Sequence, residues 1–339
     1  TGPAPGSCQT IGSPSETTII RDETVPVSFA TGNVATTGGN VVAGYWNASN
    51  TGLTVVVPVA NDATLDGGNI ELQASNDAFV TAGLVLGAPH IIVSGDRSTG
   101  TYTFIIDAAT FEALAGFADG NVWRFRAKIT DIAGNATTGT ASANTLTVDQ
   151  TVPTVTLTSA TTDNVINIAE KAAGFNVVAQ SSEATGNLYV WNTTVQEPAT
   201  DAADLVAHQF GTVVVPSANT NANIAITANN ENIINANVYN VYTIDAAGNM
   251  SAPSTSTFTA DLVAPTLTGM VYAPNSVSQD GLKKIGDIVA TQFTFDQNIT
   301  VTGNPRVLTN AGASAYFAYN SVWSGATMYM TYTVVEGES

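Results

Sequence analysis

An internal repeat constrains the fold of this chain most, because a chain made of copies of one unit folds as a series of small domains. An Asp-x-x-x-Pro segment occurs at residues 22–26, 149–153 and 261–265. An Asp-x-Ala-Gly-Asn segment occurs at residues 131–135 and 245–249, each time shortly before the next Asp-x-x-x-Pro segment. Two markers that keep one order and a similar spacing predict repeats, with these bounds: residues 22–148, 149–260 and 261–339, the last one incomplete.

The two ends of the sequence extend this pattern. Residues 13–22 are similar to the segments that lead into Asp149 and Asp261. Residues 1–21 are therefore predicted to be an N-terminal segment or the last strand of a preceding repeat. Residues 331–339 come where a sandwich domain still needs its last hairpin. We expect the sequence to be part of a longer tandem array.

Segments within each repeat have the residue pattern of β-strands. In residues 123–130, apolar side chains alternate with Arg, Lys and Thr, which is typical of a strand with one buried face. Residues 326–334 alternate in the same way, and further short segments rich in Val, Ile, Thr and aromatic residues are separated by Gly, Asn and Asp. About seven short strands per repeat predict an all-β fold of tandem immunoglobulin-like sandwiches arranged end to end. Short helices are expected only at residues 107–116 and 201–209.

Aromatic residues are assigned mainly to the cores of these sandwiches. A sandwich of this size normally buries one tryptophan, and each tryptophan here lies in an alternating strand segment. The tryptophans are Trp46, Trp123, Trp191 and Trp323. Exposed stacking faces for a sugar are more credible for Tyr319 and Tyr329, which are expected on a solvent-facing surface.

Composition excludes several classes of function. The formal net charge of −18 argues against binding to nucleic acid or to an anionic membrane surface. No apolar run reaches the roughly 18 residues that span a bilayer, so membrane insertion is not expected. A single cysteine, Cys8, and two histidines, His90 and His208, supply little material for a disulfide framework, a zinc site or histidine catalysis. Acid pairs could serve glycoside hydrolysis, but these acids recur with the repeat, as structural residues do. We therefore predict that the chain is not an enzyme.

Several motifs resemble those of large bacterial surface proteins. Residues 148–156 (VDQTVPTVT), 163–167 (DNVIN) with Glu170, and 131–135 (DIAGN) resemble the immunoglobulin-like repeats of bacterial adhesins. Residues 293–295 (FTF) and 301–305 (VTGNP) are similar to another common repeat of such proteins. The segment from Gly44-Tyr-Trp to Leu65-Asp-Gly-Gly resembles repeats in surface proteins of gliding bacteria. The resemblance implies an extracellular rod-like stalk on the bacterial cell surface, often stiffened by calcium, that takes part in adhesion or gliding motility.

The repeated acidic motifs predict a metal site at each junction between repeats. In an immunoglobulin-like sandwich, the turn before the last strand lies at the end where the chain enters, so each Asp-x-Ala-Gly-Asn turn is expected beside the preceding linker. Carboxylate and carbonyl oxygens are the ligands that Ca²⁺ prefers. Hydrogen-bonded turn chemistry without a metal explains the same motifs, and both interpretations stay open. The candidate ligands are Asp22, Asp131, Asn135, Asp149, Asp245, Asn249 and Asp261, with Asp261 expected to meet a turn beyond Ser339.

Three functions remain compatible with the sequence. The first is an adhesin stalk or filament, whose partners are neighbouring repeats of the same chain and a host surface, a glycan or other cells. The second is a subunit of a self-assembling surface lattice, which requires lateral contacts between sandwich faces. The third is a non-catalytic carbohydrate-binding module of a secreted protein, which requires an exposed aromatic cluster in one repeat.

Overall fold

The computed structural model describes residues 21–272, 283–309 and 315–336, apart from the side chains of residues 320–323. Strands in these residues form five sheets, and the helices are short. The predicted all-β fold of immunoglobulin-like sandwiches is confirmed. Cys8 and nearly all of the segment 1–21 lie outside the described residues.

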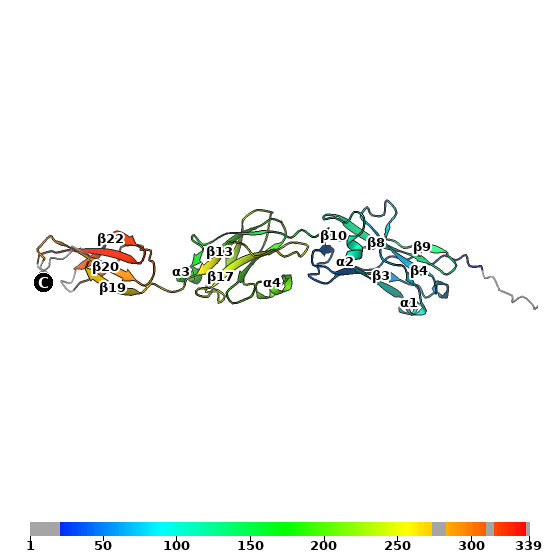
Figure 1. The fold of residues 1–339 in the computed structure, drawn as a ribbon, viewed down its shortest axis with the longest axis horizontal. Helices are drawn as coiled ribbons and strands as arrows, with labels where there is room; N and C mark the ends of the chain where they lie inside the picture. Colours follow the sequence, from blue (N-terminus) through cyan, green and yellow to red (C-terminus); the bar gives the residue numbers. More distant parts are fainter. Residues whose placement is uncertain (1–20, 273–282, 310–314, 337–339) are drawn as a thin grey trace, which may run out of the picture. The chain divides into compact units, whose positions relative to one another are not determined.

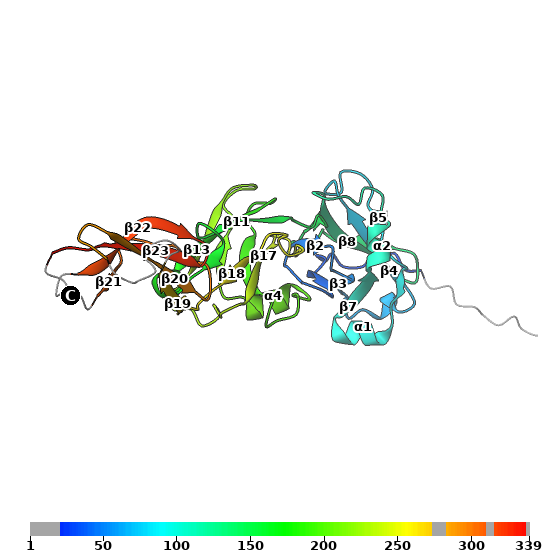
Figure 2. The same cartoon turned by 60° about the vertical axis from the view of Figure 1, so that its left-hand side comes forward.

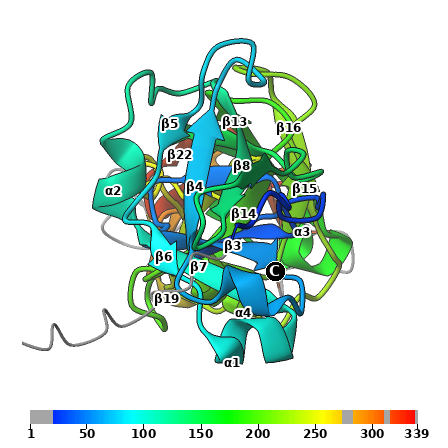
Figure 3. The same cartoon turned by 90° about the vertical axis from the view of Figure 1, so that its right-hand side faces the viewer.

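Repeat 1 is a two-sheet sandwich (Figures 1 and 3). One sheet has the order β1 (Val34–Thr37), β3 (Gly52–Pro58), β7 (Thr101–Asp107). The other has the order β2 (Tyr45–Asn47), β10 (Leu146–Asp149), β8 (Val122–Thr130), β4 (Asn69–Ser75), β5 (Leu84–Val85), with β6 (His90–Ile91) on β4 and β9 (Ala136–Thr138) on β8. The early strand β2 pairs in parallel with the last strand β10, which closes the sandwich around a common core.

The core of repeat 1 follows from the alternation seen in the sequence. In β8, side chains at alternate positions from Trp123 to Ile129 are buried, and the side chains between them are half-buried or exposed. Trp46 and Trp123 are fully buried and meet the ring of Phe111 edge-on at centroid distances of 4.9 and 5.6 Å. Trp191 is similarly buried in repeat 2. The side chain of Trp323 lies outside the described residues.

Repeat 2 has the same arrangement of strands. Its first sheet has the order β11 (Val155–Ala160), β13 (Phe175–Ser181), β16 (Ala222–Ile226). Its second sheet has the order β12 (Val165–Ile166), β18 (Phe258–Ala260), β17 (Val238–Ile244), β14 (Asn187–Asn192), β15 (Thr212–Val214). Again the early strand β12 pairs in parallel with the last strand β18.

The described residues of repeat 3 form one sheet. Its order is β19 (Leu267–Tyr272), β20 (Ile288–Phe295), β23 (Thr327–Thr333), β22 (Tyr316–Ser324), β21 (Arg306–Leu308). Tyr319 is half-buried and packs against a small cluster around Phe293, so it does not form the exposed stacking face expected of it. Tyr329 is also half-buried, and its hydroxyl lies 3.2 Å from Oε1 of Gln292.

Two of the short helices lie where the sequence predicts them, and two others were not expected. Helices α2 (Ala108–Glu112) and α4 (Ala202–His208) begin after aspartate caps, and α4 packs against β14 and β17 through Leu205 (Figure 2). Helices α1 (Ser94–Thr99) and α3 (Ile168–Ala173) bury no residue. They therefore have no apolar stripe that a search for helical periodicity could detect, although Asn167 and Glu170 form a capping box at α3. A 3₁₀ turn, η1 (Ala63–Leu65), precedes β4.

The contacts divide the chain into two compact units. The first contains the described residues up to Asn164, Asn176–Ile226 and Val238–Phe258. The second contains Val165–Phe175, Thr227–Asn237 and the described residues from Thr259 onward. Repeat 1, the linker at Asp149 and most of repeat 2 therefore belong to one unit. Within the described part of the chain, we find no helix with the length and apolar character needed to cross a membrane.

Candidate metal centre and repeat junction

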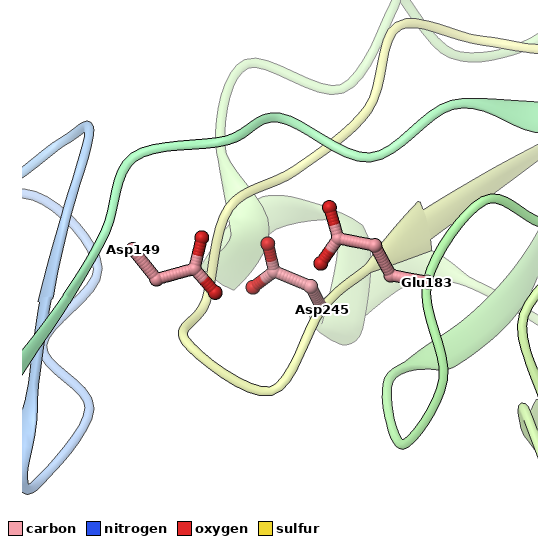
Figure 4. A group of neighbouring side chains, drawn as sticks. All are labelled: Asp149, Glu183 and Asp245. Atoms are coloured by element: carbon pink, nitrogen blue, oxygen red, sulfur yellow. The ribbon is translucent and has the colours of Figure 1, made fainter. Parts of the chain in front are cut away.

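Three carboxylates meet where repeat 1 passes into repeat 2. Asp149 ends β10, Glu183 follows β13, and Asp245 follows β17. One carboxylate oxygen of each lies within 4.8 Å of the others, and Figure 4 shows the three groups pointing toward one another. Asp245 is buried, and the other two are half-buried. All three residues belong to the first compact unit.

Burial and mutual repulsion raise the pKa values of two carboxyl groups in this cluster. Burial raises the pKa of the Asp149 carboxyl, and the negative charges of Asp245 and Asp119 raise it further. Burial also raises the pKa of Glu183, with added repulsion from Asp245, Asp149 and Asp119. A carboxylate pKa rises when the charged form lacks enough compensating positive charge or hydrogen-bond donors. The cluster therefore has the electrostatic character of a site that favours a cation.

The turn at residues 245–249 places Asp245 in the cluster. Its carboxylate accepts hydrogen bonds from the backbone N–H of Asn249 at 2.8 Å and from Asn249 Nδ2 at 2.8 Å. Asn249 Nδ2 also donates to the backbone carbonyl of Asp149 at 3.0 Å. Asn249 thus ties the linker to the turn, with the nitrogen of its amide, and not the oxygen, directed at Asp245.

The turn at residues 131–135 repeats this arrangement beside the preceding linker. Asn135 N–H and Nδ2 donate to the Asp131 carboxylate at 2.9 and 3.0 Å, and Nδ2 also donates to the carbonyl of Asp22 at 3.2 Å. Burial acts to raise the pKa of Asp131, but hydrogen bonds from Asn135 and the neighbouring backbone outweigh it and hold that pKa below its ordinary value. Each predicted turn therefore lies beside its predicted linker aspartate.

The two junctions differ in their third acidic residue. Gly68 and Gly186 occupy matching places, because a Cβ on either would lie 2.2 Å from the carbonyl oxygen that precedes Asp131 or Asp245, respectively. Three residues before these glycines stand Leu65 and Glu183. Among the residues that the structure describes, a group of three or more possible metal ligands occurs only at Asp149, Glu183 and Asp245. No sequence signal pointed to Glu183, because repeat 1 has Leu65 at the matching place and no repeated motif marks it.

Asp261 continues the linker pattern. Its carboxylate accepts the backbone N–H of Val263 at 3.1 Å, as Asp22 accepts that of Thr24 at 2.9 Å and Asp149 that of Thr151 at 3.3 Å. In each case the aspartate accepts the backbone N–H of the residue two positions before the linker proline, which fixes the bend of the linker. The predicted contact of Asp261 with a turn beyond Ser339 stays a prediction.

A second set of contacts joins repeat 1 to the turn at residues 245–249. Asn47 Nδ2 donates to the carbonyl of Ala247 at 2.7 Å, and Asn40 Nδ2 donates to that of Gly248 at 2.8 Å. The backbone N–H of Ala48 donates to Oδ1 of Asn249 at 2.9 Å. We call the segment that supplies these donors, residues 38–50, the docking loop.

The docking loop is ordered by its own asparagines. Asn47 is fully buried, and its Oδ1 accepts hydrogen bonds from the N–H and Oγ of Ser49 at 3.0 and 2.8 Å. Asn50 Oδ1 accepts the N–H of Asn47 at 2.9 Å. No repeated motif marks Asn40 or Asn47 as a junction residue. The parallel register that sets Asn47 opposite Asp149 is the signal that locates them, and it depends on knowing how β2 pairs.

Comparisons with known proteins found similar solved structures but no matching family model or curated sequence. No protein-family model matches the chain, and no curated protein sequence is similar to it. A solved structure of a Ca²⁺-stabilised adhesin with which an Antarctic bacterium binds ice is similar over 90% of this chain and 66% of its own length, at 19% identity and a TM-score of 0.38. The chain thus spans slightly less than two thirds of that structure.

Two further structures are similar at comparable levels. One is a 1.5-MDa bacterial ice-binding adhesin studied for its retention at the host cell surface, with 17% identity, 91% and 88% coverage of the two chains and a TM-score of 0.33. The other comprises fibronectin(III)-like modules of Clostridium thermocellum CbhA, with 12% identity, 65% and 90% coverage and a TM-score of 0.35. These TM-scores lie below 0.5, so the fold assignment rests on the sheets described above.

Proposed function

We propose that this chain is a structural and adhesive repeat region of a large bacterial cell-surface protein, in which successive immunoglobulin-like sandwiches form an extracellular stalk. The observation that carries the proposal is the recurrence of one junction device. At two successive linkers, an asparagine amide joins the linker aspartate to the turn of the following sandwich. A device repeated at each linker suits a chain whose purpose is to span distance, because the stiffness of an array depends on contacts between neighbouring units.

We further propose that Ca²⁺ binds at the second junction through Asp149, Glu183 and Asp245. Ca²⁺ takes 6–8 oxygen ligands in flexible geometry, and three carboxylates from separate segments supply a large part of such a set. A divalent cation would stabilise the charged forms of Asp149 and Glu183, whose pKa values are raised first by burial and then by mutual repulsion. Because the ligands come from the linker and from two loops of repeat 2, the bound ion would stabilise the junction.

A calcium titration of the full chain tests the metal proposal. Saturating Ca²⁺ at about 100 times Kd should raise the free energy of unfolding by about 2.7 kcal/mol. For a unit of this size, that gain corresponds to a rise in Tm of roughly 5–10 °C. Glu183→Gln should abolish most of this rise, whereas the control Glu231→Gln, which removes the same charge at an exposed position, should keep it. A melting curve that is identical in Ca²⁺ and in chelator would refute the metal site.

The surface location and adhesive role need a cellular test. Antibodies raised against the chain should label intact bacteria, and deletion of the gene should reduce attachment to a surface or to other cells. Labelling that requires permeabilised cells would contradict the proposed location. Unchanged attachment of the deletion strain would contradict the adhesive role.

A further inference from the structure

The turn at residues 131–135 has the same geometry as the turn at residues 245–249, but none of the described residues binds it as the docking loop binds the latter. Its Gly134 has a φ of 98°, against 95° for Gly248, and the hydrogen bonds within the two turns match. In the turn at residues 245–249, three outward-facing oxygen atoms accept hydrogen bonds from the docking loop, namely Ala247 O, Gly248 O and Asn249 Oδ1. The corresponding acceptors of the first turn are Ala133 O, Gly134 O and Asn135 Oδ1, and none of them receives a hydrogen bond from the described residues.

The two turns also differ in their exposure to solvent. Residues 247–249 are buried beneath the docking loop, whereas Ile132, Ala133 and Gly134 are exposed. A Cβ added at Gly248 would lie 2.4 Å from Asn40 Nδ2, and a Cβ added at Gly134 would meet nothing within 4 Å. The first turn therefore presents a preformed set of acceptors to solvent.

The donor of this interaction also recurs along the chain. Trp46 pairs with Val148 and Ile166 pairs with Ala260 in matching parallel strands, so Asn167 of repeat 2 corresponds to Asn47 of repeat 1. Oδ1 of Asn167 accepts backbone N–H groups of its own helix, as Oδ1 of Asn47 accepts that of Ser49. One of the two donor asparagines, Asn47, thus has a counterpart in repeat 2, and the acceptor turn has a counterpart in repeat 1.

We infer that the turn at residues 131–135 is a docking site for another immunoglobulin-like repeat, one whose loop presents two asparagine amides and a backbone N–H in the manner of Asn40, Asn47 and Ala48. The partner's amides bind Ala133 O and Gly134 O, and its backbone N–H binds Asn135 Oδ1. The sequences of the two turns differ only at Ile132 and Ala246, so the acceptor set is the same. The inference rests on the proposed tandem array, since a covalent linker raises the effective concentration of so small a contact.

The test uses a chain in which residues 22–148 are duplicated, so that residues 1–148 are followed by residues 22–339. The first copy is called the outer copy and the second the inner copy. The docking loop of the outer copy then precedes the turn 131–135 of the inner copy across the linker at Asp22. Val41→Ile in the outer copy distinguishes its peptides by mass. The measured quantity is the rate of hydrogen exchange at the Ala48 backbone amide of each copy in the presence of chelator. In the inner copy this amide donates to Asn249 Oδ1, so its exchange rate is the reference for a docked loop.

The expected result is that Ala48 exchanges in the outer copy within about threefold of its rate in the inner copy. Gly134→Ala in the inner copy should accelerate exchange in the outer loop by about tenfold or more and leave the inner loop unchanged. The inference is overturned if the outer loop exchanges as fast as the inner loop of a Gly248→Ala chain, or if its slow exchange is insensitive to Gly134→Ala. Because no metal or attachment assay is involved, either failure would leave the adhesive role and the calcium site unaffected.

Discussion

A matched pair of glycine substitutions measures what the docking loop contributes to the junction. Gly248 and Gly134 hold equivalent places in equivalent turns, with φ values of 95° and 98°. Alanine at either position adds the same methyl group to the same unfavourable backbone conformation. Only at Gly248 does that methyl group meet a neighbour, because Asn40 Nδ2 and Val42 Cγ2 would lie 2.4 and 2.8 Å from it.

The difference between the two variants can be worked out from these contacts. Backbone strain at positive φ costs each variant about 1–2 kcal/mol. Gly248→Ala also displaces the docking loop, which loses three hydrogen bonds to the turn at a net cost of about 1 kcal/mol each. We therefore expect Gly248→Ala to cost about 2–3 kcal/mol more than Gly134→Ala, which lowers the Tm of the first unit by a further 4–12 °C or so.

Calorimetric unfolding of the full chain in chelator is the suitable assay, because it removes any contribution from a bound ion. The Gly134→Ala variant serves as the control for backbone strain. Equal losses of Tm in the two variants would refute the reasoning, since they would mean that the contacts of the docking loop add nothing to stability.

Two further predictions concern the acidic cluster and the core. Without a divalent cation, the raised pKa values of Asp149 and Glu183 mean that the folded state binds more protons than the unfolded state, so the free energy of unfolding should fall as pH rises through those values. Urea unfolding across about pH 4–7 should show this slope, and Glu183→Gln should flatten it. A slope that is unchanged in the variant would contradict the assignment. Phe111→Ala should cost about 3–5 kcal/mol in urea unfolding, because Phe111 is fully buried and its ring contacts Trp46, Trp123 and Phe125; a loss below about 1 kcal/mol would be inconsistent with this core.

Strands were predictable because burial on one face leaves a period of two in the sequence. The segments 123–130 and 187–191 lie in β8 (Val122–Thr130) and β14 (Asn187–Asn192), with bounds within a residue or two. Helices α1 and α3 were missed because they bury no side chain and so leave no apolar period. Their formation depends on local capping, such as the hydrogen bonds of Asn167 at α3.

Only those residues of the candidate site that belong to repeated motifs could be predicted from the sequence. Asp149 and Asp245 belong to repeated motifs, and general sandwich topology was enough to expect them close together. Glu183 has Leu65 at the matching place, so no repetition marked it. Asn40 and Asn47 lie in a loop whose partner is about 200 residues away along the chain. Such contacts depend on how two sandwiches meet, which local sequence patterns do not encode.

The asparagines at the junctions have a consequence for the choice of expression host. Asn47, Asn135 and Asn249 each begin an Asn-x-Ser/Thr sequence, the acceptor for N-linked oligosaccharides in secretory pathways that have the machinery. The sugar would be joined to Nδ2, the atom with which Asn249 holds Asp149 and Asp245 and with which Asn47 reaches Ala247. Asn47 and Asn249 are 0% and 4% exposed, which leaves no room for a saccharide in the assembled junction. Glycosylation of either asparagine during secretion from a eukaryotic cell would therefore block these hydrogen bonds between the two sandwiches, whereas a bacterial host without that machinery would leave them intact.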